Sequence, residues 1–258
     1  MERFITLLSF LTRIPVKTSG KLDEEFHKSA KYFSLVGIVL GIFYLIFGLA
    51  TSKIFGAHIG ALVFISTNII LTGGLHLDGL GDTFDGLYSY RDKDRILEIM
   101  KDSRLGTNAL LAILILILFK IALADKFISQ GYYYGLFFMP IMGKMASVHA
   151  CYKGKTEKKN GMGNAFIGKV SAIDFYIALG IGILAMVLPS IIIKDYSIAI
   201  INVTVVIIVI ILTLGYMNHV YKIIDGLTGD ILGAICELSE VVYLFMYYLG
   251  VTLWQLFI

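Results

Sequence analysis

The chain has 258 residues, of which 57% are hydrophobic and only 16% carry a charge. Its mean hydropathy is +0.82, whereas a soluble domain has about 25% charged residues. Such a chain has too little polar surface to cover itself in water, which excludes a soluble enzyme, a disordered protein and a nucleic-acid-binding domain. The formal net charge is only +3, so the positions of the 22 basic and 19 acidic residues are more informative than their sum.

The N-terminal segment predicts a short helix that lies on the membrane surface. Apolar side chains at positions 4, 7, 8 and 11 share one helical face, which Arg3 and Arg13 flank. Pro15 stops this helix, and no cleavage site of small residues follows, so the segment does not resemble a signal peptide. Residues 91–104 mix apolar and charged positions in a similar way and predict a second interfacial helix.

Seven segments are apolar enough, or nearly so, to cross a membrane, which takes about twenty residues as a helix. Glycines and polar residues interrupt the second, fourth and seventh. In chain order the segments are 32–50, 57–75, 108–124, 132–150, 172–193, 197–217 and 231–249. The predicted fold is therefore all-α, a polytopic integral membrane protein of about seven transmembrane helices plus short interfacial helices. Residues 1–258 are predicted to form one membrane-embedded catalytic domain.

The basic residues predict the orientation of these spans. Seventeen of them lie in the N-terminal segment and in every second loop after it. The alternate loops hold only Lys53, Lys126 and Lys194, while Lys120 and Lys144 fall inside predicted spans. Because basic loops stay in the cytoplasm, we expect a multi-pass protein of the cytoplasmic membrane with its N-terminus and base-rich loops on the cytoplasmic side.

The most informative motif is GGLHLDGLGDTFDGL at residues 73–87, at the cytoplasmic end of the second predicted span. Asp78, Asp82 and Asp85 are spaced i, i+4 and i+7, which places three carboxylates on one side of a helix. A divalent cation relieves their repulsion, and Mg²⁺ prefers carboxylates, phosphates and water. We therefore predict all three as Mg²⁺ ligands and catalytic residues. A solvated helix end is the alternative, but the intervening side chains are mostly apolar.

A second acidic motif, DGLTGDILGAICELSE, occupies residues 225–240. Asp230, Glu237 and Glu240 again share one helical face, and both glutamates lie in the seventh predicted span. An ionised acid there costs at least ~2–3 kcal/mol unless it is paired or hydrated. We predict both glutamates as catalytic, with an ion pair to an intramembrane lysine as the alternative. Asp225 and Asp230 precede the span and are expected near the first motif, Asp230 as a metal ligand and Asp225 as a substrate contact.

Basic residues between the two acidic motifs are predicted to bind phosphate. Lys101 and Arg104 could hold phosphate oxygens, arginine in a bidentate manner. Contacts with lipid headgroups are an equal alternative for both. His76 is predicted as a substrate contact rather than a metal ligand, because Mg²⁺ does not favour imidazole. The basic, glycine-containing loop at 153–166 has no Walker pattern. An ordinary cytoplasmic loop is favoured for its lysines, and a loop that closes over a ligand is the alternative.

Clustered carboxylates, nearby bases and a membrane-embedded cytoplasmic cavity favour group transfer at a pyrophosphate. Such a site would stabilise negative charge as a nucleoside monophosphate leaves. One aspartate could act as general base toward an attacking hydroxyl. The spacing of these residues does not identify the substrate.

Four sequence blocks resemble the cobalamin synthase family, the adenosylcobinamide-GDP ribazoletransferases. These blocks are FLTRIPV (10–16), GGLHLDGLGDTFDGL (73–87), RILEIMKDSRLGTNAL (95–110) and GLTGDILGAICELSE (226–240). The resemblance implies an Mg²⁺-dependent membrane phosphotransferase of late vitamin B12 biosynthesis. Such an enzyme joins adenosylcobinamide-GDP with α-ribazole or its 5′-phosphate, releases GMP, and gives adenosylcobalamin or its 5′-phosphate. A homo-oligomer is compatible with the resemblance.

Two other functions remain as alternatives. The segment from Asp82 to Gly86 resembles the start of the CDP-alcohol phosphotransferase motif, but Ser89 and Tyr90 stand where Ala-Arg is expected and the later aspartates are missing. A cation-coupled transporter would also contain intramembrane acids. A transporter should place its acids near the bilayer midplane and show repeated halves, whereas most acids of this chain lie at the cytoplasmic edge and no repeat is visible.

Overall fold

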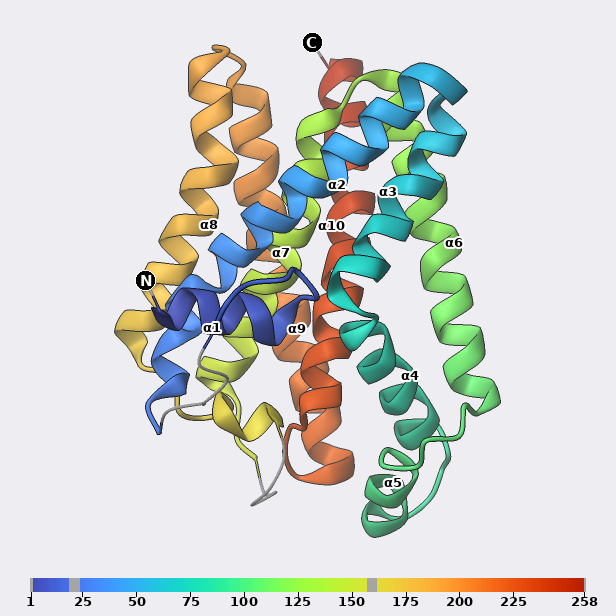
Figure 1. Cartoon of the computed structure of the whole chain (residues 1–258), viewed down its shortest axis with the longest axis vertical. Helices are drawn as coiled ribbons and strands as arrows, with labels where there is room; N and C mark the ends of the chain where they lie inside the picture. Colours follow the sequence, from blue (N-terminus) through green and yellow to red (C-terminus); the bar gives the residue numbers. More distant parts are fainter. Residues whose placement is uncertain (1, 19–23, 157–161, 258) are drawn as a thin grey trace.

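The computed structural model describes residues 2–18, 24–156 and 162–257, and within these residues the protein is helical without strands (Figure 1). The predicted all-α fold is therefore confirmed. Lys21 and the loop positions 157–161, which the sequence places among the basic cytoplasmic residues, lie outside the described part. In chain order the elements are α1 (Glu2–Leu11), η1 (Phe26–Tyr32), α2 (Phe33–Phe55), α3 (Ala57–Thr72), α4 (Leu75–Leu87), α5 (Lys93–Ile99), α6 (Thr107–Gln130), α7 (Tyr133–Lys153), η2 (Met162–Ala165), α8 (Ala172–Ile192), α9 (Tyr196–Ile224) and α10 (Gly229–Phe257).

The predicted count of about seven spans is not exact. Among the described residues, five helices are long and apolar enough to cross a membrane: α2 together with η1, α6, α8, α9 and α10. The predicted second span corresponds to α3, which has only 16 residues. The number of spans rises to six only if α3 and α4 are counted together as one span. Because α4 is bent by 87° from α3, we treat α4 as lying beyond the spanning segment.

The predicted span at 132–150 coincides with α7, which other helices enclose. Every residue from Phe138 to Cys151 is buried, including Lys144 and His149. These polar residues lower the hydropathy of α7 below that of a lipid-facing helix. They are tolerated because protein, rather than hydrocarbon, surrounds them.

The outer faces of the bundle are apolar. Large side chains such as Leu118 on α6, Leu184 on α8 and Ile207 on α9 are more than half exposed. A soluble protein seldom exposes so extended an apolar surface. This surface fits contact with lipid acyl chains and supports the polytopic membrane fold.

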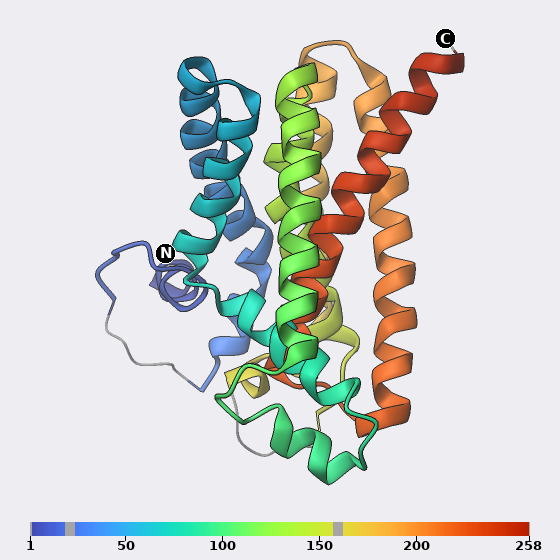
Figure 2. The ribbon, with the colours of Figure 1, turned by 90° about the vertical axis from the view of Figure 1, so that its right-hand side faces the viewer.

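The connections between the helices gather at two ends (Figures 1 and 2). The α2–α3, α6–α7 and α8–α9 turns, which are poor in basic residues, lie at the upper end in Figure 1. The lower end holds α4, α5, η2 and the α9–α10 connection. Helix α1 lies across the bundle, so Figure 2 shows it nearly end-on.

Two consecutive glycines make the turn that directs α4. Gly73 and Gly74 both adopt left-handed backbone conformations, with φ of 62° and 70°. Their amide groups donate to the carbonyls of Ile70 and Ile69 and so close the end of α3. A residue with a Cβ would be strained at either position. This turn sends the first acidic motif toward α10.

Candidate active site

Helix α4 carries the first acidic motif and crosses the start of α10 at a contact between glycines. A Cβ on Gly79 would lie only 2.8 Å from the carbonyl oxygen of Asp230. A Cβ on Gly233 would lie 3.3 Å from the Cα of Gly79. Larger residues would force the two helices apart. The glycines therefore allow the carboxylates of the two acidic motifs to approach each other.

Asp82 lies among three other carboxylates. Its burial, followed by the negative charges of Asp78, Asp230 and Asp85, raises the pKa of Asp82 from 3.8 to about 7. Burial, and then the proximity of like charges, therefore make the ionised state of Asp82 unfavourable. A bound cation would remove this penalty.

The carboxylates do not enclose a cation by themselves. Among the described residues, no group of three or more His, Cys, Asp or Glu side chains is placed to hold a metal ion. Mg²⁺, however, is commonly held by one or two carboxylates together with water and substrate phosphates. The donor set of Asp78, Asp82 and Asp230 fits that type of site, and Mg²⁺ binding here remains a prediction.

Asp85 caps the start of α6. Its Oδ2 accepts a hydrogen bond from the Gly106 N–H at 2.7 Å, and its Oδ1 accepts one from the Ala109 N–H at 2.9 Å. These contacts satisfy amide groups that have no partner within the helix. The carboxylate thus ties α4 to α6, in addition to any role as the metal ligand that its spacing predicts.

Replacing Asp85 with alanine should lower the free energy of unfolding by about 1–2 kcal/mol, because the amide groups of Gly106 and Ala109 at the start of α6 lose their acceptor. Denaturant unfolding in detergent, followed by circular dichroism, measures the change. The control is Asp92→Ala, which removes the exposed aspartate whose side chain accepts from the Arg95 amide at the start of the short helix α5. A loss no larger than that of the control would contradict the capping role.

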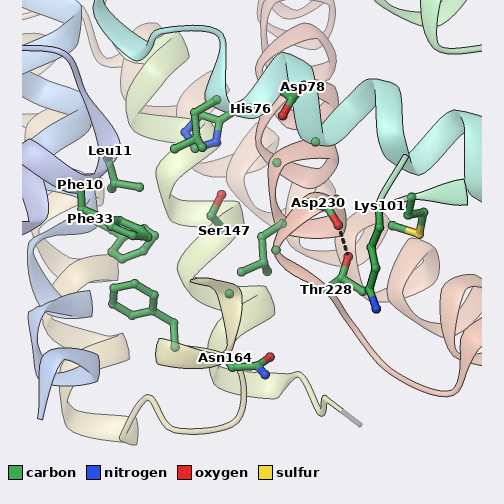
Figure 3. A pocket seen from close by; sticks show the side chains of 18 residues that line it. Phe10, Leu11, Phe33, His76, Asp78, Lys101, Ser147, Asn164, Thr228 and Asp230 are labelled. Atoms are coloured by element: carbon green, nitrogen blue, oxygen red, sulfur yellow. Dashed lines mark hydrogen bonds between the residues drawn. The ribbon is translucent and has the colours of Figure 1, made fainter. Parts of the chain in front are cut away.

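A cavity of about 300 Å³ lies beside the acidic residues (Figure 3). Side chains from α1, α2, α4, α7 and α10 contribute to its wall, together with the segments around Lys101 and η2. Its polar side chains are His76, Asp78, Lys101, Ser147, Asn164, Thr228 and Asp230, and its larger apolar ones are Phe10, Leu11, Phe33, Leu75, Met100, Phe166 and Leu232. Sequence reasoning missed Ser147, for which no local pattern gives a signal. It did not single out Asn164, although the glycine-containing loop at 153–166 that includes this residue is a candidate to close over a ligand.

The first turn of α10 lies in the cavity wall. Thr228 accepts a hydrogen bond from the Ile231 N–H at 3.3 Å and donates one to Asp230 Oδ2 at 3.2 Å (Figure 3). The N-terminus of a helix carries partial positive charge and binds phosphate groups. Lys101 lines the same cavity. The two features together favour a phosphate group close to the carboxylates.

His76 lies in the cavity wall and contacts a buried lysine. The Lys144 Nζ is 2.7 Å from His76 Nε2. An ammonium group has no lone pair, so His76 accepts this bond and carries its proton on Nδ1. Burial, and then the positive charges of Lys144 and Lys120, lower the pKa of His76 well below its usual value. A neutral imidazole with an Nδ1–H donor fits the predicted substrate contact.

Glu237 and Glu240 lie away from the cavity, inside the helix bundle. Both pair with the Lys120 ammonium, which lies 2.6 Å from Glu237 Oε2 and 2.5 Å from Glu240 Oε2. All three side chains are almost fully buried. The structural ion pair that the sequence left as an alternative is therefore present. Neither glutamate lines the cavity described above.

Arg104 and Asp225 do not line the cavity either. The Arg104 guanidinium binds Asp102 on the protein surface, with its Nε 3.0 Å from Asp102 Oδ1. Asp225 ends α9 in an exposed turn, where it forms an ion pair of 2.9 Å with Lys93. Of the four residues predicted to contact substrate, the structure thus brings His76 and Lys101 to the cavity.

The chain is similar to known proteins over nearly its whole length. Residues 3–248 match the family model described as cobalamin-5-phosphate synthase. The chain is 43% identical over 251 residues to the adenosylcobinamide-GDP ribazoletransferase of Clostridioides difficile, covering 96% of this chain and 98% of that protein. It is also 43% identical over 249 residues to the protein of the same name from Alkaliphilus metalliredigens, covering 95% and 94% of the two chains. No solved structure matches.

Proposed function

The chain belongs to the cobalamin-5-phosphate synthase family, and on this premise we propose that its cavity carries out the adenosylcobinamide-GDP ribazoletransferase reaction with Mg²⁺ as cofactor. The observation that carries the proposal is the crossing of α4 and α10, which places Asp78 and Asp230 in the wall of a cavity that Lys101 also lines. Asp82 does not line the cavity but lies close enough to both carboxylates for their charges to raise its pKa. Neither acidic motif alone provides this arrangement.

The reaction breaks the phosphoanhydride bond of the pyrophosphate and forms a new phosphate ester bond. A hydroxyl of α-ribazole, or of its 5′-phosphate, attacks the phosphorus on the cobinamide side of the pyrophosphate. The bond from that phosphorus to the bridging oxygen breaks, and GMP leaves with the bridging oxygen. The proton of the attacking hydroxyl passes to one of the carboxylates of Asp78, Asp82 and Asp230.

The residues that line the cavity, together with the neighbouring Asp82, have distinct roles in this reaction. Asp78, Asp82 and Asp230 would hold Mg²⁺, which would neutralise the pyrophosphate and stabilise the charge that develops on GMP. Lys101 and the amide groups at the start of α10 bind phosphate oxygens. The His76 Nδ1–H donates to a substrate oxygen, and Lys144 keeps that proton on Nδ1 by occupying Nε2.

The active site is proposed to face the cytoplasm. Two observations support this: α4 and the start of α10, which carry Asp78, Asp82 and Asp230, lie at the end of the bundle opposite the base-poor turns, and base-rich loops stay on the cytoplasmic side of a membrane. A water-soluble nucleotide product such as GMP would then be released into the cell.

Purified protein in detergent should release GMP when it receives adenosylcobinamide-GDP and α-ribazole. Removing divalent cations with EDTA should lower the rate by at least about 100-fold, and added Mg²⁺ should restore it, because the pyrophosphate loses its counter-charge. Chromatography of the nucleotide products measures the rate, and a reaction without α-ribazole is the control. Absence of Mg²⁺-dependent GMP release would refute the proposal, and release of CMP from a CDP-alcohol would favour the other phosphotransferase class.

A further inference from the structure

One side of the cavity consists of aromatic rings that have no role in the proposed reaction steps. Phe10 of α1, Phe33 of α2 and Phe166 next to η2 all line it. The ring centroids of Phe10 and Phe166 are 6.0 Å apart, and those of Phe33 and Phe166 are 5.2 Å apart. Figure 3 shows Phe10, Phe33 and Leu11 on the side of the cavity opposite Asp230 and Lys101.

All three rings line the cavity, and Phe33 and Phe166 are also buried members of the hydrophobic core. Phe26 packs against Phe166, with ring centroids 5.1 Å apart, but it does not line the cavity. Phe26 therefore supports the aromatic wall from behind. Phe10 is only partly buried, as expected of a ring whose face is available to a ligand.

The volume of the cavity limits the size of the ligand that it can enclose. A cavity of about 300 Å³ is at the lower end of small-molecule sites, which span about 300–1,000 Å³. It can enclose one nucleoside but not a corrinoid, whose macrocycle is several times larger. If the proposed function is correct, the occupant is either the guanosine of adenosylcobinamide-GDP or α-ribazole.

The chemistry of the aromatic wall distinguishes the two nucleosides. Guanine has N–H donors and a carbonyl along its edge, and burying them without partners costs free energy. The benzimidazole base of α-ribazole is planar, carries two methyl groups and has no N–H donor. Phenylalanine and leucine side chains offer stacking and apolar contact but no hydrogen bonds. The wall therefore matches the benzimidazole and not guanine.

We propose that Phe10, Phe33 and Phe166 form the binding site for the base of α-ribazole, an inference that rests on the proposed function. The sugar then extends toward Asp78 and Asp230 on the other side of the cavity, where the pyrophosphate binds. The corrinoid ring stays outside the cavity. Helix α1 consequently belongs to the acceptor site, although it lies far from the acidic motifs in the sequence.

Phe10→Leu should raise the KM for α-ribazole about tenfold or more, because an apolar pocket loses this much when an aromatic contact is truncated. The KM for adenosylcobinamide-GDP should stay at its wild-type value. The matched control is Phe4→Leu, the same change on the same helix, where the ring packs against Tyr32 with centroids 5.9 Å apart. This control should leave both KM values unchanged.

Two results would overturn the inference: a rise in the KM for adenosylcobinamide-GDP instead, or no change in either KM. A second measurement needs neither turnover nor a variant, and follows the binding of free α-ribazole to the wild-type protein by equilibrium dialysis. Unlabelled α-ribazole should displace labelled α-ribazole from the protein, and guanosine should not. Displacement by guanosine, or no binding of α-ribazole, contradicts the assignment.

The two proposals can fail separately. If wild-type protein releases GMP but the KM for α-ribazole does not depend on Phe10, the assignment of the aromatic wall is wrong and the proposed function stands. If α-ribazole binds in a Phe10-dependent manner but no GMP is released under any metal condition, the proposed reaction is wrong and the binding site stands.

Discussion

Replacing Asp82 with asparagine should abolish GMP release, with a loss of about 10²–10⁴-fold, while the protein stays folded and inserted. Asp82 is the carboxylate on which the charges of Asp78, Asp85 and Asp230 all act. Asparagine keeps the size of the side chain but removes the negative charge that would hold Mg²⁺. The rate of GMP release measures the loss of turnover, and the elution profile in detergent shows whether the protein stays folded.

The control for this variant is Asp94→Asn, at an exposed position on α5. It changes the net charge equally and should leave turnover unchanged. Wild-type turnover in Asp82→Asn would disprove the assignment of the acidic group as the metal site.

The same variant has an expected effect on stability in the absence of Mg²⁺. The pKa of Asp82 is raised in the folded protein to about 7, so the folded state binds this proton more tightly than the unfolded state does. Wild-type stability should therefore fall as the pH rises from about 4 through about 7. Asparagine does not ionise, so Asp82→Asn should be more stable than wild type at pH 8 and similar to it at pH 4. Thermal unfolding at both pH values tests the sign.

Replacing Lys120 with methionine should lower the free energy of unfolding by about 3–5 kcal/mol. Lys120 lies between Glu237 and Glu240, and all three side chains are buried in the bundle. Without the ammonium, two carboxylates remain together in a region of low dielectric constant. They must either take up protons or disrupt the packing of α6 against α10. Denaturant unfolding in detergent measures the loss.

Two comparisons make this prediction specific. Lys126→Met, at an exposed position on the same helix, should change stability little. The triple variant Lys120→Met, Glu237→Gln, Glu240→Gln should recover most of the loss, because an apolar or neutral replacement of a whole buried ion pair is often harmless. A Lys120→Met variant as stable as wild type would show that the ion pair does not stabilise the bundle.

The glutamates also carry a catalytic prediction that can be tested separately from their structural one. Loss of turnover in a folded Glu237→Gln protein would support the role that the sequence indicates. Unchanged turnover would leave the pairing with Lys120 as their only function.

Much of the fold was accessible from the sequence because it depends on local properties. A run of apolar residues makes a helix in a membrane whatever its neighbours are, and the alternation of basic loops requires no knowledge of packing. The same holds for the acidic motifs, since a spacing of i, i+4 and i+7 along α4 places three carboxylates on one side of any helix. For these reasons the helices, the separation of loops into two ends and the acidic candidates could be predicted.

The tertiary structure decided which of these candidates meet. The common side of the membrane predicts that Asp230 lies near the first acidic motif, but only the glycine contact between α4 and α10 determines how closely it approaches Asp82, 148 positions away in the sequence. Packing also commits Asp85 to the start of α6 and the two glutamates to Lys120. The hydropathy of α7 predicts a span, yet its buried polar residues are tolerated only because other helices enclose it. Burial, ion pairing and cavity walls all depend on how helices cross, and a pattern along one chain segment contains no information about the segment that packs against it.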